Sequence, residues 1–142
     1  MRVAALATLH NGEANLAMVA YVVAEDFSAF YIHVSRLGKH TRDMKDDPRV
    51  SLLITESDDP RPDPQTLQRV STRGTAVLLP RPDPGYARIK GIYLARFPEA
   101  EKLFSLEDFN LWKITPKGGR LVAGFGRAFY LLTETLKKVS AL

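Results

Sequence analysis

The chain has 142 residues, the length of one ordinary domain. With 45% hydrophobic and 25% charged residues, it has the composition of a folded globular domain rather than of a disordered chain. Cysteine is absent from the sequence, which excludes disulfides, thiolate metal sites, iron–sulfur clusters and cysteine nucleophiles. The sequence therefore predicts a single domain over residues 1–142 that folds without covalent cross-links.

The charge of the chain is weakly basic, with 20 Lys and Arg against 16 Asp and Glu. Cations alternate with acids, as in residues 36–47, so we expect no clustered basic face of the kind that binds nucleic acid. The longest apolar run, residues 16–24, is far shorter than the roughly 20 residues that a membrane-spanning helix needs. The N-terminal apolar stretch ends at Leu9, too early for a signal peptide. We expect a cytoplasmic protein without nucleic-acid or membrane partners.

The N-terminal part of the chain predicts a β-hairpin. Two apolar strands, expected over residues 2–9 and 15–24, are separated by Asn11-Gly12, a dipeptide typical of a two-residue hairpin turn. The second strand is rich in valine and apolar on both faces. Such a pattern indicates a strand that is covered on both sides, as in a barrel wall that also meets another surface.

A third strand is expected over residues 27–34, where bulky residues alternate. The alternation assigns Phe30, Ile32 and Val34 to one face and Tyr31 and His33 to the other.

A helix is predicted to follow this strand directly, from Ser35 to about Asp47. A serine at the first position can cap the free amides of the first turn, and Pro48 stops the helix. Arg36 and Lys39 stand in that turn, so amides, hydroxyl and cations could together bind an anion such as phosphate. The alternative is an ordinary capped helix whose cations face solvent.

The rest of the chain predicts further strands and a second helical stretch. The expected elements are a strand over 49–56, a strand over 67–79 with a bulge or a bend at Gly74, helical residues 85–104 broken at Phe97-Pro98, strands over 108–116 and 120–126 on either side of Lys117-Gly118-Gly119, and a short helix over 132–140. Six or seven strands without regular strand–helix alternation favour a mainly β antiparallel barrel with peripheral helices over a doubly wound sheet.

Several motifs then occur in the order typical of one family. They are Val34-Ser35-Arg36-Leu37, His40-Thr41-Arg42, Asp47-Pro48-Arg49-Val50-Ser51-Leu52-Leu53, Tyr93-Leu94-Ala95-Arg96-Phe97-Pro98, Asp108-Phe109 and Gly124-Phe125-Gly126-Arg127-Ala128. In these motifs the sequence resembles the pyridoxamine 5′-phosphate oxidase-like FMN-binding split-barrel family, and within it the haem-utilisation-type subgroup. The resemblance implies a six-stranded antiparallel split β-barrel that forms a homodimer, with FMN at the subunit interface.

The resemblance also implies which residues meet the cofactor. Ser35 and Arg36 would hold the flavin phosphate, and the backbone of residues 18–20 would run beside the isoalloxazine ring. His40 and Asp108 match positions implicated in haem binding or turnover in haem-handling relatives. The cofactor-binding residues implied in this way are Met18, Val19, Ala20, Ser35, Arg36, Lys39, His40, Thr41, Arg42 and Phe125.

Three functions are open at this point. The first expectation is an FMN-dependent oxidoreductase that acts on an unidentified small-molecule redox substrate. The alternatives are a haem-binding or haem-utilisation protein that uses His40 with Asp108, and a non-catalytic flavin binder. Ala17 stands where relatives usually carry a polar residue, and Val22 stands where the pyridoxamine phosphate oxidases carry a phosphate-binding lysine. Oxidation of a B6 vitamer is therefore not expected. The three histidines are too scattered to predict a separate metal site.

Overall fold

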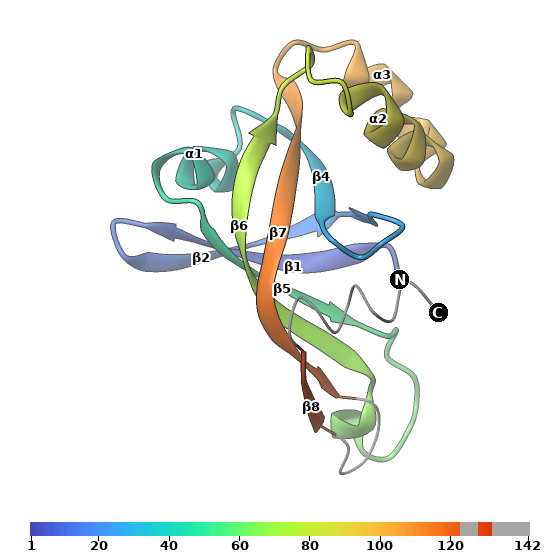
Figure 1. Cartoon of the computed structure of the whole chain (residues 1–142). Coiled ribbons are helices and arrows are strands. Elements are labelled where there is room, and N and C mark those ends of the chain that lie inside the picture. The colour runs from blue at the N-terminus through green and yellow to red at the C-terminus, as the bar shows by residue number, and fades with distance from the viewer. Residues whose placement is uncertain (123–127, 132–142) are drawn as a thin grey trace.

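The computed structural model describes residues 1–122 and 128–131 (Figure 1). Strands predominate in this part of the chain. They are β1 (Val3–His10), β2 (Glu13–Ala20), β3 (Val22–Val23), β4 (Phe30–Ser35), β5 (Arg49–Thr55), β6 (Arg69–Leu79), β7 (Phe109–Val122) and β8 (Ala128–Leu131). The helices are α1 (Lys39–Asp46), α2 (Tyr86–Arg96) and α3 (Glu101–Phe104), with 3-10 turns at Pro64–Thr66 and Pro98–Ala100.

All of these strands pair antiparallel in the order β2-β1-β5-β6-β7-β4-β3, and β8 pairs with β7. β1 and β2 run across the direction of β6 and β7, so the sheet curls into a half-barrel (Figure 1). This is the mainly β split-barrel architecture that the sequence predicts. The described residues form eight strands, against the six or seven that were expected: β3 is the end of the strand expected over 15–24, β7 joins two expected strands, and β8 is additional.

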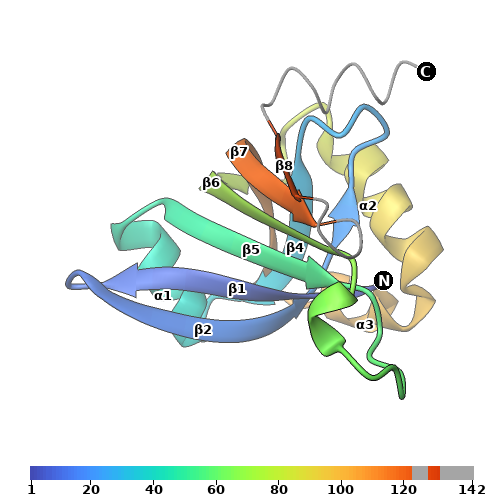
Figure 2. The same cartoon turned by 90° about the horizontal axis from the view of Figure 1, so that it is seen from below.

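The helices lie at different parts of the sheet (Figure 2). α1 packs against β1 and β2, whereas α2 contacts β3 and α3 contacts β7. None of the helices in the described ranges is long and apolar enough to cross a membrane.

The N-terminal hairpin is confirmed. Asn11 and Gly12 both have positive φ, 51° and 80°, as a two-residue turn of this hand requires. β1 and β2 pair along their whole length, from Val3 opposite Ala20 to the residues beside the turn. The strand expected over 15–24 is instead divided, because β2 ends at Ala20 and β3 begins at Val22.

The alternation predicted for the third strand is also confirmed, although β4 begins at Phe30 rather than at residue 27. Phe30, Ile32 and Val34 belong to a core cluster inside the curled sheet, together with Leu6 and Ile114 among others. On the opposite face, a second cluster packs beneath α2 and α3. Its most buried members are Val22, Ala29, Ile89, Tyr93 and Leu111.

The helix start predicted at Ser35 is wrong. Ser35 is the last residue of β4 and pairs with Phe109, so its backbone is extended. A turn separates the strand from α1, and Gly38 is the N-cap, with extended φ and ψ of −67° and 143° and no side-chain cap. Pairing with a distant strand has overridden the local capping signal.

The separation of two strands at Lys117-Gly118-Gly119 is wrong as well, because β7 runs through these residues without a break. Gly118 has a φ of 132°, which suits glycine, and the register with β6 shifts at Arg73 and Gly74. The bulge expected at Gly74 is therefore confirmed, and it lets the two strands stay paired past the glycines. The predicted helix over 132–140 and most of the strand end over 120–126 lie outside the described residues.

Gly119 and Gly91 provide a matched stability test. A Cβ at Gly119 would collide with the Ser71 carbonyl oxygen and lie 3.0 Å from Thr72 Cα, whereas a Cβ at Gly91 meets nothing within 4 Å. We expect Gly119→Ala to cost about 1–3 kcal/mol through overpacking, and Gly91→Ala in the exposed helix α2 to stabilise by about 0.5–1 kcal/mol. Thermal denaturation of both variants checks this. Equal melting temperatures would refute the close approach of β6 and β7.

Candidate functional site

Ser35, where β4 ends, is bound to the residues that precede β7. Its hydroxyl Oγ donates to Asp108 Oδ2 over 2.9 Å and accepts a hydrogen bond from the Leu37 amide over 3.1 Å. The Arg36 amide donates to the carbonyl oxygen of Asp108 over 2.6 Å. Two segments far apart in sequence are thus joined at the entrance to α1. We refer to these contacts between Asp108 and residues 35–36 as the Asp108 clasp.

Side chains in the first turn of α1 donate hydrogen bonds to the segment that joins β4 to α1. Thr41 is buried, and its Oγ1 donates to the Ser35 carbonyl oxygen over 2.6 Å. The Arg42 guanidinium donates to the Leu37 carbonyl oxygen over 3.2 Å. Both side chains implied by the resemblance as phosphate neighbours therefore bind the chain's own carbonyl groups. Arg36 and Lys39 are exposed.

The geometry of the junction is unfavourable for a phosphate at Ser35. The Asp108 carboxylate receives the hydroxyl hydrogen that a phosphate oxygen would need, and it adds negative charge at that position. A dianionic ligand would have to displace Asp108 or tolerate its charge. The residues present therefore fit a flavin phosphate only partly, through the exposed cations Arg36 and Lys39.

His40 lies on α1 next to this junction. Its ring is half-buried, and the Nε2 atom is buried without a hydrogen-bond partner among the described residues. Burial lowers the pKa of His40, and the nearby Asp43 carboxylate opposes that shift. The ring is therefore kept in the neutral form, which carries the lone pair that a haem iron binds. The donor chemistry of this residue fits haem, and the iron would reach the buried Nε2 only after the ring turns outward.

A polar network that the sequence analysis did not identify fixes α1 to the hairpin. Asp43 is 1% exposed and accepts hydrogen bonds from Thr8 Oγ1 over 2.7 Å and from Asn15 Nδ2 over 3.2 Å. The half-exposed His10 places Nδ1 3.4 Å from Asp43 Oδ1. Thr8 is the one polar residue among the inward-facing residues of β1, and this pattern could have marked it as a member of a buried polar network. Its partner Asp43 depends on the fold and could not be predicted in this way.

Residues 18–20 divide between the two faces of β2. Val19 is buried in the core, whereas Met18 points outward and is 77% exposed. β2 lies at one end of the strand order among the described residues, so alternate backbone groups of this segment face away from β1. The structure thus leaves the implied flavin contacts of residues 18–20 as a prediction. Phe125 lies outside the described residues.

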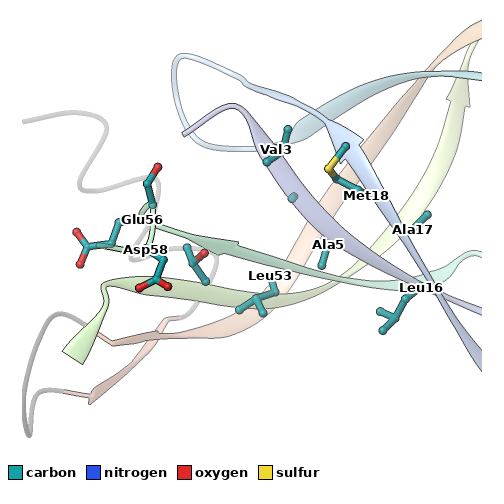
Figure 3. Close-up of a pocket in the computed structure, with 11 residues that line it drawn as sticks. Val3, Ala5, Leu16, Ala17, Met18, Leu53, Glu56 and Asp58 are labelled. Atoms are coloured by element: carbon teal, nitrogen blue, oxygen red, sulfur yellow. The ribbon is translucent and has the colours of Figure 1, made fainter. Parts of the chain in front are cut away.

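The outer face of β1, β2 and β5 carries an apolar hollow of about 480 Å³. Figure 3 shows Leu16 and Met18 from β2 beside Val3 and Leu53, with Glu56 and Asp58 at one end. A second hollow on the same sheet is lined by Ala7, Leu9 and Ser51, and by the cations Arg49, Arg73 and Lys117. An apolar surface between an acidic end and a basic end is typical of a protein interface.

Metal ligation by clustered side chains is not indicated. Within residues 1–122 and 128–131, no group of three or more His, Asp or Glu side chains is placed to hold a metal ion. A cofactor at the junction would therefore depend on single side chains such as His40.

The curled antiparallel sheet with its peripheral helices defines a protein of the split-barrel class. The sequence profile described as pyridoxamine 5′-phosphate oxidase matches residues 1–123. The chain belongs to the pyridoxamine 5′-phosphate oxidase family.

Two relatives of the chain are named as heme oxygenases. The chain is similar to the non-canonical heme oxygenase HOZ, chloroplastic, of Arabidopsis thaliana, with 33% identity over 120 residues that cover 84% of this chain and 35% of that protein. It is 24% identical over 126 residues to the heme oxygenase HutZ of Vibrio cholerae, covering 88% of this chain and 70% of HutZ. The chain thus spans about a third of the plant protein and about two thirds of the bacterial one.

The chain is also similar in structure to a solved heme binding protein. The heme binding protein from Mycobacterium smegmatis superposes with a TM-score of 0.86 at 26% identity, over 97% of this chain and 55% of that chain. The similarity therefore covers nearly all of this chain but only about half of the mycobacterial protein.

Replacing Asp108 tests its effect on phosphate binding. We expect Asp108→Asn to tighten FMN binding by about 10-fold, because the substitution removes a negative charge and leaves Ser35 able to donate to phosphate. Quenching of flavin fluorescence on titration measures the affinity. Asp59→Asn, which removes an acid in the proline-rich loop, is the matched control and should leave FMN affinity unchanged. Identical FMN affinities for Asp108→Asn and the unmodified protein would contradict this account of the junction.

Proposed function

We propose that the protein binds haem at the junction between β4 and α1, with His40 as the ligand to the iron. The observation that carries this proposal is the buried Nε2 of His40, which has a neutral ring and no partner in the described structure. Bound haem would supply an iron centre capable of electron transfer or oxygen chemistry. The names of the relatives, two heme oxygenases and a heme binding protein, support haem as the cofactor.

The charges around the junction support the same ligand. Arg36 and Lys39 are exposed and stand within four residues of His40 in the sequence. Cations at such positions can pair with the carboxylates of haem propionates. Asp108 already occupies the Ser35 hydroxyl, so Ser35 is not available to a phosphate unless the Asp108 clasp opens. Haem needs no hydrogen bond from Ser35, and for this reason the junction favours haem over FMN.

FMN binding is the second candidate function. Membership of the pyridoxamine 5′-phosphate oxidase family and the exposed cations Arg36 and Lys39 support it. In that case the protein would be an FMN-dependent oxidoreductase or a flavin binder without catalysis. Whether bound haem is degraded or only held is a further step of the proposal, and a cytoplasmic location remains a prediction.

Titration with haem and with FMN tests the proposal. The purified protein should show a shifted Soret band with haem. His40→Ala should lower the affinity for haem at least about 10-fold, because the iron loses its ligand. His40→Ala should leave FMN affinity close to that of the unmodified protein.

His10→Ala is the matched control for the haem titration, because it removes another histidine near α1 that the proposal does not use. It should keep haem affinity. If the unmodified protein does not bind haem, or if His40→Ala binds it equally well, the proposed site is wrong. A tightly bound yellow flavin in the purified protein would favour the second candidate.

We also propose that two copies of the chain associate through the outer face of β1, β2 and β5. Leu16 and Met18 are each 77% exposed and Val3 is 49% exposed, which is unusual for adjacent apolar residues on a strand surface. A second copy related by a twofold axis would bring the same apolar surface opposite itself. The acidic end of one copy, at Glu56 and Asp58, could then face the basic end of the other.

Charging this face tests the dimer. Met18→Glu places a carboxylate at the centre of the proposed interface, so we expect the dimer dissociation constant to rise at least about 10-fold. Light scattering over a range of micromolar concentrations measures it. Leu106→Glu, at an apolar residue that is 44% exposed before β7, is the control and should not change the mass. A stable monomer in the unmodified protein would refute the proposed dimer.

A further inference from the structure

His33 is buried between the sheet and the helical layer formed by α2 and α3. Only 7% of it is exposed, and its ring stacks on Phe104 of α3 with centroids 3.7 Å apart and planes at 7°. Tyr93 of α2 meets the ring edge-on at 5.7 Å, and Phe109 of β7 lies at 5.5 Å. The imidazole therefore contacts all three elements that meet at this point.

Both nitrogens of His33 are buried, and neither has a hydrogen-bond partner among the described residues. The charged groups that face the ring are Arg81, from the loop after β6, and Lys90 of α2. The other titratable neighbour is Tyr93, whose pKa is raised by burial. Burial, with help from the two cations, lowers the pKa of His33 to about 4. Among the described residues, both charged groups that act on the ring are cations, so they oppose a charged imidazolium.

The same contacts connect His33 to the candidate functional site. Phe109, which touches the ring, directly follows Asp108 and pairs with Ser35 across β4 and β7. The Arg81 guanidinium donates to the carbonyl oxygens of Leu106 and Phe109 over 2.9 Å and 3.3 Å, so it fixes the loop that carries Asp108. A displacement of the aromatic contacts around His33 would therefore reach the Asp108 clasp.

We propose that His33 is an acid-sensitive latch: protonation of its ring releases α2 and α3 from the sheet and loosens the Asp108 clasp. The latch consists of His33 and its aromatic contacts Tyr93, Phe104 and Phe109. At neutral pH the uncharged ring stacks among these side chains. Protonation adds a second N–H and a positive charge, and neither N–H has an acceptor among the described residues, while the charge faces two cations. The charged ring therefore favours an arrangement that exposes it to water.

The direction of the pH dependence follows from linkage. The closed latch binds its proton only near pH 4, whereas a ring exposed by opening would titrate near its ordinary value of 6.5. The free-energy difference that favours the closed state over the open state is therefore largest above about pH 6.5. This difference decreases as the pH falls toward 4. Over that interval the equilibrium constant for opening should rise on the order of 100-fold, and it should level off at lower pH.

Hydrogen exchange of the apoprotein tests the latch without any cofactor, so a failure of the haem proposal does not affect the outcome. Protection factors of the α2, α3 and Ser35–Arg36 amides should fall on the order of 100-fold between pH 7 and pH 4. Amides in the centres of β1 and β5 serve as an internal control and should change much less. In His33→Phe the ring can stack but cannot be protonated, so protection of α2 and α3 should stay constant. His10→Gln should behave like the unmodified protein.

Histidine ring signals in NMR spectra provide a second measurement, which holds even if His33→Phe does not fold. The His33 ring should remain neutral down to about pH 4.5, and in Lys90→Gln it should titrate at higher pH because one repelling cation is gone. The latch is refuted if His33 titrates near pH 6.5 in the folded protein. It is equally refuted if His33→Phe folds and loses α2 and α3 protection with the same pH dependence as the unmodified protein.

Discussion

The long strand β7 is the constraint on which the arrangement of this protein depends. It pairs with β6 on one side, and on the other with β4 near its start and β8 near its end. Because Phe109 lies opposite Ser35, the residue before it, Asp108, is brought to the entrance of α1. Because Leu111 lies opposite His33, the same strand also sets the position of the aromatic cluster. Both the candidate site and the latch are consequences of one register.

The choice between cofactors depends on how the split barrel presents charge at this point. A serine, two cations and a helix start would together suit phosphate. The Asp108 carboxylate changes that chemistry by accepting the serine hydroxyl hydrogen, and His40 adds a neutral nitrogen beside it. The same backbone framework can thus favour different cofactors through substitutions at one or two side chains. This explains why membership of the pyridoxamine 5′-phosphate oxidase family does not by itself identify the ligand.

Local patterns predicted much of the fold, but not the contacts that define the site. The Asn11-Gly12 dipeptide predicted the N-terminal hairpin, and the alternation around Ile32 predicted the two faces of β4. Both predictions were correct because turn geometry and strand period are properties of short segments. The helix start at Ser35 failed because pairing with Phe109 and the hydrogen bond to Asp108 come from residues over seventy positions away. Gly118 and Gly119 indicated a break between two strands, although the positive φ of Gly118 and the close approach of β6 at Gly119 also call for glycine. Hydrogen bonds to Asp43 likewise depend on the position of α1 on the hairpin.

The separation between Ser35 and Asp108 along the chain also bears on the order of folding. The N-terminal hairpin closes through a two-residue turn, whereas β4 and β7 must meet across a long intervening stretch. Non-local strand pairing is slow, because the entropy of closing the loop is lost before the contacts form. A nascent or partly folded chain can therefore possess the hairpin and α1 without yet possessing the junction. Ligand binding at the junction beside His40 would then report on completion of the fold, since the junction exists only once β4 and β7 have paired.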